Sequence, residues 1–149
     1  MQWSYEDNAG FSSAPSKQLV RPLIKDGEYG YKKVNVEQQR YDPHSLLNRV
    51  ERMIRLRKEH PEFGFGNCTI VDSAEPAVFA IQAEWEGNTT MAVHNVAERP
   101  ACFRWRLSPA DSKQLVDVFH GDRFAPRADG SVEIDLEPYG FRWLEVRHG

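Results

Sequence analysis

The fold of this chain is decided by residues 77–96, which read AVFAIQAEWEGNTTMAVHNV. Apolar side chains alternate with polar or small ones before and after Glu86-Gly87-Asn88, a sequence typical of a turn. Alternation with a period of two on both sides of a turn is typical of a β-hairpin. We therefore predict two antiparallel strands, at residues 77–85 and 89–96.

The same pattern continues outward through the second half of the chain. Five further short segments read as strands: 68–71, 101–107, 114–119, 131–136 and 141–146. Turn residues separate them, so that turns recur every ~8–12 residues, which is typical of an antiparallel β-sandwich. We predict a mainly β fold, with the sandwich at residues 63–149.

One helix is predicted before the sandwich, at residues 43–59. Asp42 is a good N-cap, Pro43 suits the first helical position, and His60-Pro61 ends the helix. Apolar residues recur at helical spacing along one face: Leu46, Leu47, Val50, Met53 and Ile54. Basic residues occupy the other side, which we interpret as a solvated face rather than an anion site.

Residues 1–42 are rich in aromatics and turn formers but show neither helical nor strand periodicity. Disordered segments are poor in aromatics, and structureless segments longer than about 12–15 residues are uncommon in a compact domain. We therefore expect this long irregular segment to pack on a larger body.

Composition limits the classes of protein that the chain can represent. With 149 residues and a net charge of −3, it is one soluble domain or one domain with an extension, and not a dedicated nucleic-acid binder. No apolar run approaches the ~18–20 residues of a membrane span, and no signal peptide is evident. Two cysteines make no disulfide framework and fit the cytoplasm.

Searches for reactive groups lead to the expectation of no metal, no cofactor and no catalytic residue. The five histidines are scattered, there is no CxxC or GxSxG motif, and the carboxylates look like solvated surface groups. Cys68 and Cys102 lie in predicted strands, where we expect buried small apolar side chains. Trp85, Trp105 and Trp143 are candidates for stacking on a sugar ring, with core packing as the alternative.

Several short motifs extend along the chain from its first residue. They are Met1–Ser4, Asn8–Ser12, Tyr29–Tyr31, Val34–Glu37, Asp42-Pro43, Ser45–Asn48, Arg52–Ile54, His60-Pro61, Phe63-Gly64 and Pro138–Phe141. Together they resemble the end of the α-amylase superfamily enzymes of glycoside hydrolase family 13, and the Tyr-Gly-Tyr element narrows the resemblance to the trehalose synthases, which interconvert maltose and trehalose.

The resemblance implies a domain organisation and a partial site. Residues 1–62 would be the last loop and last helix of a (β/α)8 barrel, and residues 63–149 the C-terminal β domain. Gln2, Asn8 and Phe11 would approach an aglycone sugar at the rim of the barrel. The family's catalytic Asp, Glu and second Asp precede the motif that begins at Met1, so we expect this chain to be non-catalytic, and a truncated reading frame would explain its start.

Three functions stay open at this point. The chain is a structural C-terminal portion of a trehalose synthase-like enzyme, a free-standing carbohydrate-binding module, or a subunit that complements a separately encoded barrel. The expected partners are an α-glucan or disaccharide, and a barrel domain or a second copy contacted through residues 1–60, without nucleic acid or membrane.

Overall fold

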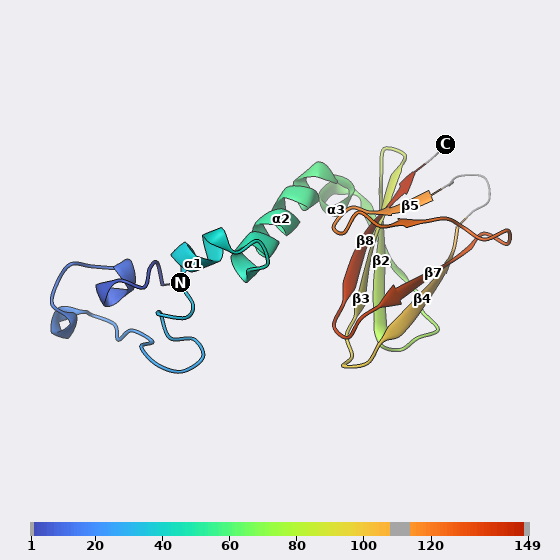
Figure 1. Cartoon of the computed structure of the whole chain (residues 1–149). Coiled ribbons are helices and arrows are strands. Elements are labelled where there is room, and N and C mark those ends of the chain that lie inside the picture. The colour runs from blue at the N-terminus through green and yellow to red at the C-terminus, as the bar shows by residue number, and fades with distance from the viewer. Residues whose placement is uncertain (1, 108–113, 148–149) are drawn as a thin grey trace. The chain divides into compact units, whose positions relative to one another are not determined.

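The computed structural model describes residues 2–107 and 114–147 and divides the chain into two compact units, 1–55 and 56–149 (Figure 1). The division lies within helix α2 (Leu46–Glu59), earlier in the chain than the boundary predicted after residue 62. Short helix α3 (Glu62–Phe65) packs on strands β2 and β3, so this turn belongs with the sandwich. Met1, the first residue of the quoted motifs, lies outside the described residues.

The second unit contains the predicted antiparallel sandwich. One sheet has the strand order β1 (Asn67–Val71), β2 (Val78–Trp85), β3 (Asn88–Asn95), β8 (Phe141–Arg147), β5 (Gln114–Asp117) and β6 (Arg123–Phe124). The other pairs β4 (Ala101–Arg106) with β7 (Ser131–Leu136). All seven predicted strands are present, and the mainly β fold is confirmed. Strand β6 was not predicted, because two residues are too short to show alternation.

The hairpin that decides the fold has the turn its sequence predicts. Trp85 pairs with Asn88, and the two residues between them, Glu86 and Gly87, both have positive φ, at 48° and 81°. Positive φ at both central positions defines a type I′ turn, whose twist matches that of paired strands. The turn therefore sets the register of the whole β2–β3 ladder.

The register places one row of apolar side chains between the two sheets. Ala80 lies opposite Val93, and Met91 opposite Leu144, on the face that meets the Phe103–Ile134 pair of the smaller sheet. Phe103, Met91, Val93, Ile134 and Leu144 are fully buried. Burial of one large apolar side chain contributes about 1.5–3 kcal/mol, so this layer is the main source of stability in the unit.

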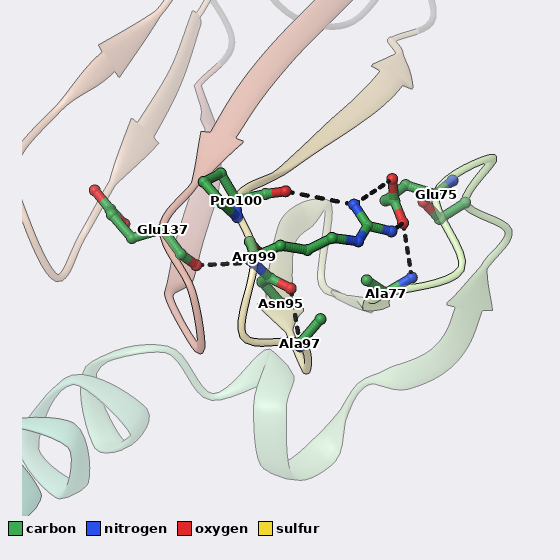
Figure 2. Close-up of polar contacts among 8 residues, drawn as sticks. Glu75, Ala77, Asn95, Ala97, Arg99, Pro100 and Glu137 are labelled. Atoms are coloured by element: carbon green, nitrogen blue, oxygen red, sulfur yellow. Dashed lines mark hydrogen bonds and ion pairs between the residues drawn. The ribbon is translucent and has the colours of Figure 1, made fainter.

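A buried amide joins the loops at one end of the sandwich (Figure 2). The Asn95 Nδ2 donates to the carbonyl oxygens of Arg99 (2.7 Å) and Glu137 (2.9 Å), while its Oδ1 accepts from the Ala97 N–H at 3.0 Å. The Arg99 guanidinium in turn donates to both carboxylate oxygens of Glu75, at 2.6 and 3.2 Å. This hydrogen bond holds the pKa of Glu75 below its usual value. The loops before β2, after β3 and after β7 are thus tied together.

The first unit is less irregular than predicted. Helix α1 (Val36–Tyr41) begins at Asn35, whose Oδ1 accepts from the Gln38 N–H at 2.8 Å. Two further N–H groups, of Val36 and Glu37, donate to the carbonyl oxygens of residues 2 and 3 at 2.9 Å. Six residues are too few to show helical periodicity, which is why the sequence did not reveal α1. Two 3-10 turns, Asp7–Gly10 and Ser16–Gln18, complete the regular structure.

Helix α2 begins later than predicted. Ser45, rather than Asp42, caps it, since the Ser45 Oγ accepts from the Asn48 N–H at 3.2 Å. Asp42 instead forms a turn by accepting from the His44 N–H at 2.9 Å. No residue of α2 is buried, and Leu46 and Ile54 in its apolar stripe are 68% and 53% exposed. The described chain therefore leaves this stripe largely uncovered.

Replacing the buried amide tests the loop junction. We expect Asn95→Ala to lower the free energy of unfolding of the sandwich by about 2–3 kcal/mol, because two carbonyls and one N–H lose their partner. Urea denaturation measures this change. Asn67→Ala, at an exposed strand position, is the control and should change stability by less than about 0.5 kcal/mol. Equal midpoints for the two variants would show that the junction contributes nothing.

Candidate functional site

Of the three predicted rim residues, Gln2 is held by the backbone of its own unit. Its Nε2 donates to the carbonyl oxygens of Tyr29 (3.2 Å) and Val34 (3.3 Å). Its Oε1 is buried and has no hydrogen-bond partner among residues 2–107 and 114–147. Gln2 therefore links the start of the chain to the segment before α1, and one acceptor remains unused.

Asn8 and Phe11 lie together in an open hollow of about 710 Å³ formed by residues 6–8 and 10–16. Asn8 is buried and has a φ of 56°, a conformation that Asn tolerates better than most residues. Its Nδ2 donates to the carbonyls of Ser12 and Ala14, and its Oδ1 accepts from the Ser16 hydroxyl at 2.8 Å. All its polar atoms thus hold the loop, whereas Phe11 is 52% exposed. Gln2 does not line this hollow.

Trp143 does not fit the predicted role in sugar stacking. It is buried, with 9% exposure, and its ring packs against Phe63 (5.3 Å between centroids), Phe119 (6.3 Å) and Phe141 (6.4 Å). A sugar could not reach a ring enclosed in this way. The alternative that the sequence left open, core packing, describes this residue.

Trp105 is half-buried and packs against the core between the two sheets. Around it, a shallow hollow of about 400 Å³ is lined by charged side chains of β4 and the turn before β7. Arg104 and Arg127 both pair with Glu133, and the hydrogen bond from Arg127 lowers the pKa of this carboxyl. Because these charged groups form ion pairs with one another, we interpret the hollow as a polar surface in contact with solvent.

Trp85 is the tryptophan of the three that combines exposure with an aromatic partner. It is 38% exposed and lies at the end of β2, where its ring is 6.0 Å from that of Phe65, with a 40° tilt. Phe65, in α3, is 73% exposed. Phe65 could not be predicted from the sequence, because no local pattern indicates that α3 packs back onto β2.

The buried carboxylates have local structural partners. Asp117 is fully buried and accepts from the Phe119 N–H (2.9 Å) and from the His120 Nδ1 (2.7 Å), with the Arg142 Nε 3.4 Å away. Glu62, 3% exposed, lies 3.2 Å from the His60 Nδ1. The prediction that carboxylates are surface groups is wrong for these two. Each carboxyl group lies beside partners that are close to it in sequence or on the neighbouring strand, as expected of buried polar groups.

The two cysteines differ from the expectation of buried apolar side chains. Cys68 is exposed on β1, at the edge of the larger sheet, and Cys102 is half-buried on β4. Burial is the main cause that raises the pKa of the Cys102 thiol, followed by its hydrogen bond with Asp135. Within residues 2–107 and 114–147, the structure holds no cluster of three His, Cys, Asp or Glu side chains suited to a metal ion.

The outer face of the larger sheet is largely apolar across four strands, β1, β2, β3 and β8. Strand register aligns Ile70, Ile81 and Ala92 with Trp143 in one row, and Phe79 with His94 and Phe141 in a second. We call these seven residues the outer face. Ile70 is 68% exposed and Phe79 43% exposed, while the burial of His94 lowers the pKa of its imidazole.

Helix α3 covers one end of the outer face. Its Phe63 packs on Trp143, and the helix contacts both β2 and β3. Gly66, directly after α3, permits this approach: a Cβ there would lie 2.5–2.6 Å from the carbonyl oxygens of Glu62 and Glu84. Beyond the part of the outer face that α3 covers, Ile70 and Phe79 are exposed.

No helix in the described part of the chain is both long and apolar enough to cross a membrane.

Two family models match the chain in tandem. Residues 68–143, more than half of the chain, match the C-terminal domain of maltogenic amylase, and residues 1–66 match the α-amylase catalytic domain. The chain belongs to the α-amylase superfamily. The junction of the two matches coincides with the start of β1 at Asn67, so α3 lies in the catalytic-domain match and the sheet in the C-terminal one.

Relatives of this superfamily chain include trehalose synthases. That of Thermus thermophilus is 35% identical over 99% of this chain and 15% of its own length, and that of Pimelobacter sp. (strain R48) is 31% identical over 98% and 26%. The chain thus spans about a quarter of one of these relatives and less of the other. A crystal structure of the trehalulose synthase MutB superposes with a TM-score of 0.69 at 22% identity, covering 98% of this chain and 24% of that one, which shows a shared fold.

The role of Asn8 in its loop can be tested directly. Asn8→Ala removes three hydrogen bonds and keeps a side chain at positive φ, so the Ala9 and Phe11 amides should exchange with solvent about tenfold faster, the equivalent of ~1.4 kcal/mol. Hydrogen exchange measured by NMR reports on both amides. Phe11→Ala removes an exposed ring and serves as the control. Unchanged exchange in Asn8→Ala would mean that the loop does not depend on this amide.

Proposed function

We propose that this chain is the non-catalytic C-terminal part of a trehalose synthase-like enzyme, where it completes the last turn of a (β/α)8 barrel and covers its side. The single observation that supports this role most is the outer face. It is apolar and partly exposed, and α3, which matches the catalytic domain, already packs on one end of it.

The chemistry of the outer face favours a large apolar partner. Exposed apolar patches on otherwise polar proteins mark interaction surfaces, and Ile70 and Phe79 lie in adjoining rows on one side of the sheet. Because the catalytic-domain match ends beside this face, the rest of a catalytic domain is the partner we assign to it. The stripe of α2, with Leu46 and Ile54 exposed, would meet the barrel in the same way that barrel helices bury one apolar side.

The reaction of the trehalose synthases would then depend on groups outside this chain. A complete barrel takes roughly 250 residues, and 66 residues here match the catalytic domain. The buried carboxylates Glu62 and Asp117 are held by His60 and by His120 with Arg142, and belong to the sandwich unit. In the full enzyme, Phe11 is the rim residue best placed to contact substrate, since Asn8 is used by its own loop.

Substitutions on the outer face test this role. We expect Ile70→Asp and Phe79→Asp to weaken, by at least about tenfold, binding of the 149-residue chain to the catalytic part of the T. thermophilus trehalose synthase cut before the matching region, since burying a charge against an apolar partner is costly. Both side chains are exposed in the free chain, so its unfolding midpoint should change little. Analytical ultracentrifugation of the mixed proteins measures the association.

Thr69→Asp is the matched control. Thr69 is exposed on the same strand as Ile70 but points to the opposite side of the sheet, so this variant should bind the barrel like the unsubstituted chain. No complex with the unsubstituted chain would contradict the proposed role. Equal binding by all variants would place the contact elsewhere.

A direct assay checks the non-catalytic part of the proposal. The purified 149-residue chain, incubated with maltose or with trehalose, should give neither interconversion nor glucose release above the buffer blank. Addition of the catalytic part should restore interconversion if the chain acts as a complementing subunit. Any turnover by the chain alone that scales with its concentration would contradict the proposal.

A further inference from the structure

We propose that Asp26-Gly27 is a site of spontaneous isoaspartate formation, a covalent modification of the backbone whose only co-reactant is water. Asp26 and Gly27 are both exposed and lie in a loop that is closed at its base by the Tyr31 N–H, which donates to the Ile24 carbonyl at 2.9 Å. The site lies wholly within the first unit. This proposal therefore does not depend on the role assigned to the outer face.

The reaction joins a side chain to the peptide bond that follows it. The backbone nitrogen of Gly27 attacks Cγ of the protonated Asp26 carboxyl. A C–N bond forms, and the amide proton leaves with the carboxyl hydroxyl as water, which closes a succinimide ring. Hydrolysis then adds one water molecule and opens the ring. Opening at the main-chain carbonyl of Asp26 leaves the chain running through Cγ, so the product has an unchanged mass, an extra methylene in the backbone and a free α-carboxyl group.

The structure leaves the reacting groups of Asp26-Gly27 free to meet. Among residues 2–107 and 114–147, neither the Asp26 carboxyl nor the Gly27 N–H has a hydrogen-bond partner. A Cβ on Gly27 would meet nothing within 4 Å, so no neighbour obstructs rotation of this peptide. Glycine also has the widest choice of backbone conformations and no side chain to shield its nitrogen. The nitrogen can therefore approach Cγ without breaking an existing contact.

A second Asp-Gly sequence in the chain shows what restrains the same reaction. Oδ1 of Asp129, which is also exposed, accepts from the Ser131 N–H at 3.0 Å and from its hydroxyl at 2.6 Å. The hydroxyl hydrogen bond is the main cause that lowers the pKa of the Asp129 carboxyl, which disfavours the reactive protonated form. The Gly130 N–H donates to the Arg127 carbonyl at 2.9 Å, and a Cβ on Gly130 would lie 2.9 Å from the Leu107 carbonyl oxygen. Both reacting groups are thus held, and we expect slow reaction there.

Isoaspartate at Asp26 would disturb the contact that holds one predicted rim residue. The Tyr29 carbonyl, in the same loop, accepts from the Gln2 Nε2 at 3.2 Å. The backbone of Gly30 packs so tightly against the Lys25 carbonyl that a Cβ on Gly30 would lie 2.7 Å from its oxygen. An extra methylene beside this contact must move the loop, and we expect the Gln2 hydrogen bond to weaken. The expected partner of the modified chain is a methyltransferase that recognises isoaspartyl groups.

Incubation of the full 149-residue chain at mildly acidic pH tests the site. Mass spectrometry of chymotryptic peptides with electron-transfer fragmentation distinguishes isoaspartyl from aspartyl residues of equal mass. We expect isoaspartate to accumulate at Asp26 at least about tenfold faster than at Asp129. Asp26→Glu keeps the charge and should give no product at this position, because the longer side chain would have to close a larger ring. The rate at Asp129 should be the same in this variant.

The same incubation in urea is the matched control. In the unfolded chain the two Asp-Gly sequences lose their different surroundings, so their rates should agree within about twofold. The proposal is overturned if no isoaspartate forms at Asp26, or if Asp129 reacts as fast as Asp26 in the folded chain. A tenfold difference that persists in urea would also overturn it, because the flanking sequence and not the fold would then be the cause. These measurements need neither a barrel nor a sugar, so they are independent of the proposed function.

Discussion

The structure depends on one constraint: a sheet with two apolar faces must have both of them covered. The inner face of the larger sheet meets β4 and β7, with Phe103, Met91 and Leu144 fully enclosed. Among the described residues, α3 is the helix that packs on the outer face, through Phe63 on Trp143. Because Ile70 and Phe79 remain exposed, the outer face is covered only in part. We propose that the rest of a catalytic domain covers this outer face in the full-length enzyme.

Much of the sandwich could be predicted from sequence, because period-two alternation and turn residues are local signals. The hairpin around Glu86-Gly87 illustrates this, since its turn type and its register follow from a few neighbouring residues. The two-residue strand Arg123–Phe124 and the six-residue helix α1 were not predicted, because both are too short for a periodic pattern to repeat. The start of α2 was misplaced because Asp42 and Ser45 are both good caps, and the choice between them depends on tertiary hydrogen bonds.

The candidate sites were harder to predict, because burial and long-range pairing decide them. The three tryptophans look alike in sequence, yet Trp143 is enclosed by aromatics, Trp105 packs on the core and Trp85 stays open beside Phe65. Asn8, expected to approach a sugar at the barrel rim, is buried, and its side-chain amide is hydrogen-bonded within its own loop. The burial of Asp117 could not be predicted from sequence, because its partner Arg142 is distant in sequence and lies beside it only through the pairing of β5 with β8.

Hydroxyl-radical footprinting of the outer face tests the central claim most directly. In the 149-residue chain alone, Phe79 should be oxidised readily, and the half-buried Phe141 more slowly. With the catalytic part of a trehalose synthase present, both should be protected, while Tyr139, which is exposed in the loop before β8, should react as before. Equal oxidation of Phe79 and Phe141 in the two samples, under conditions where the proteins associate, would contradict the claim that this face is where the barrel binds.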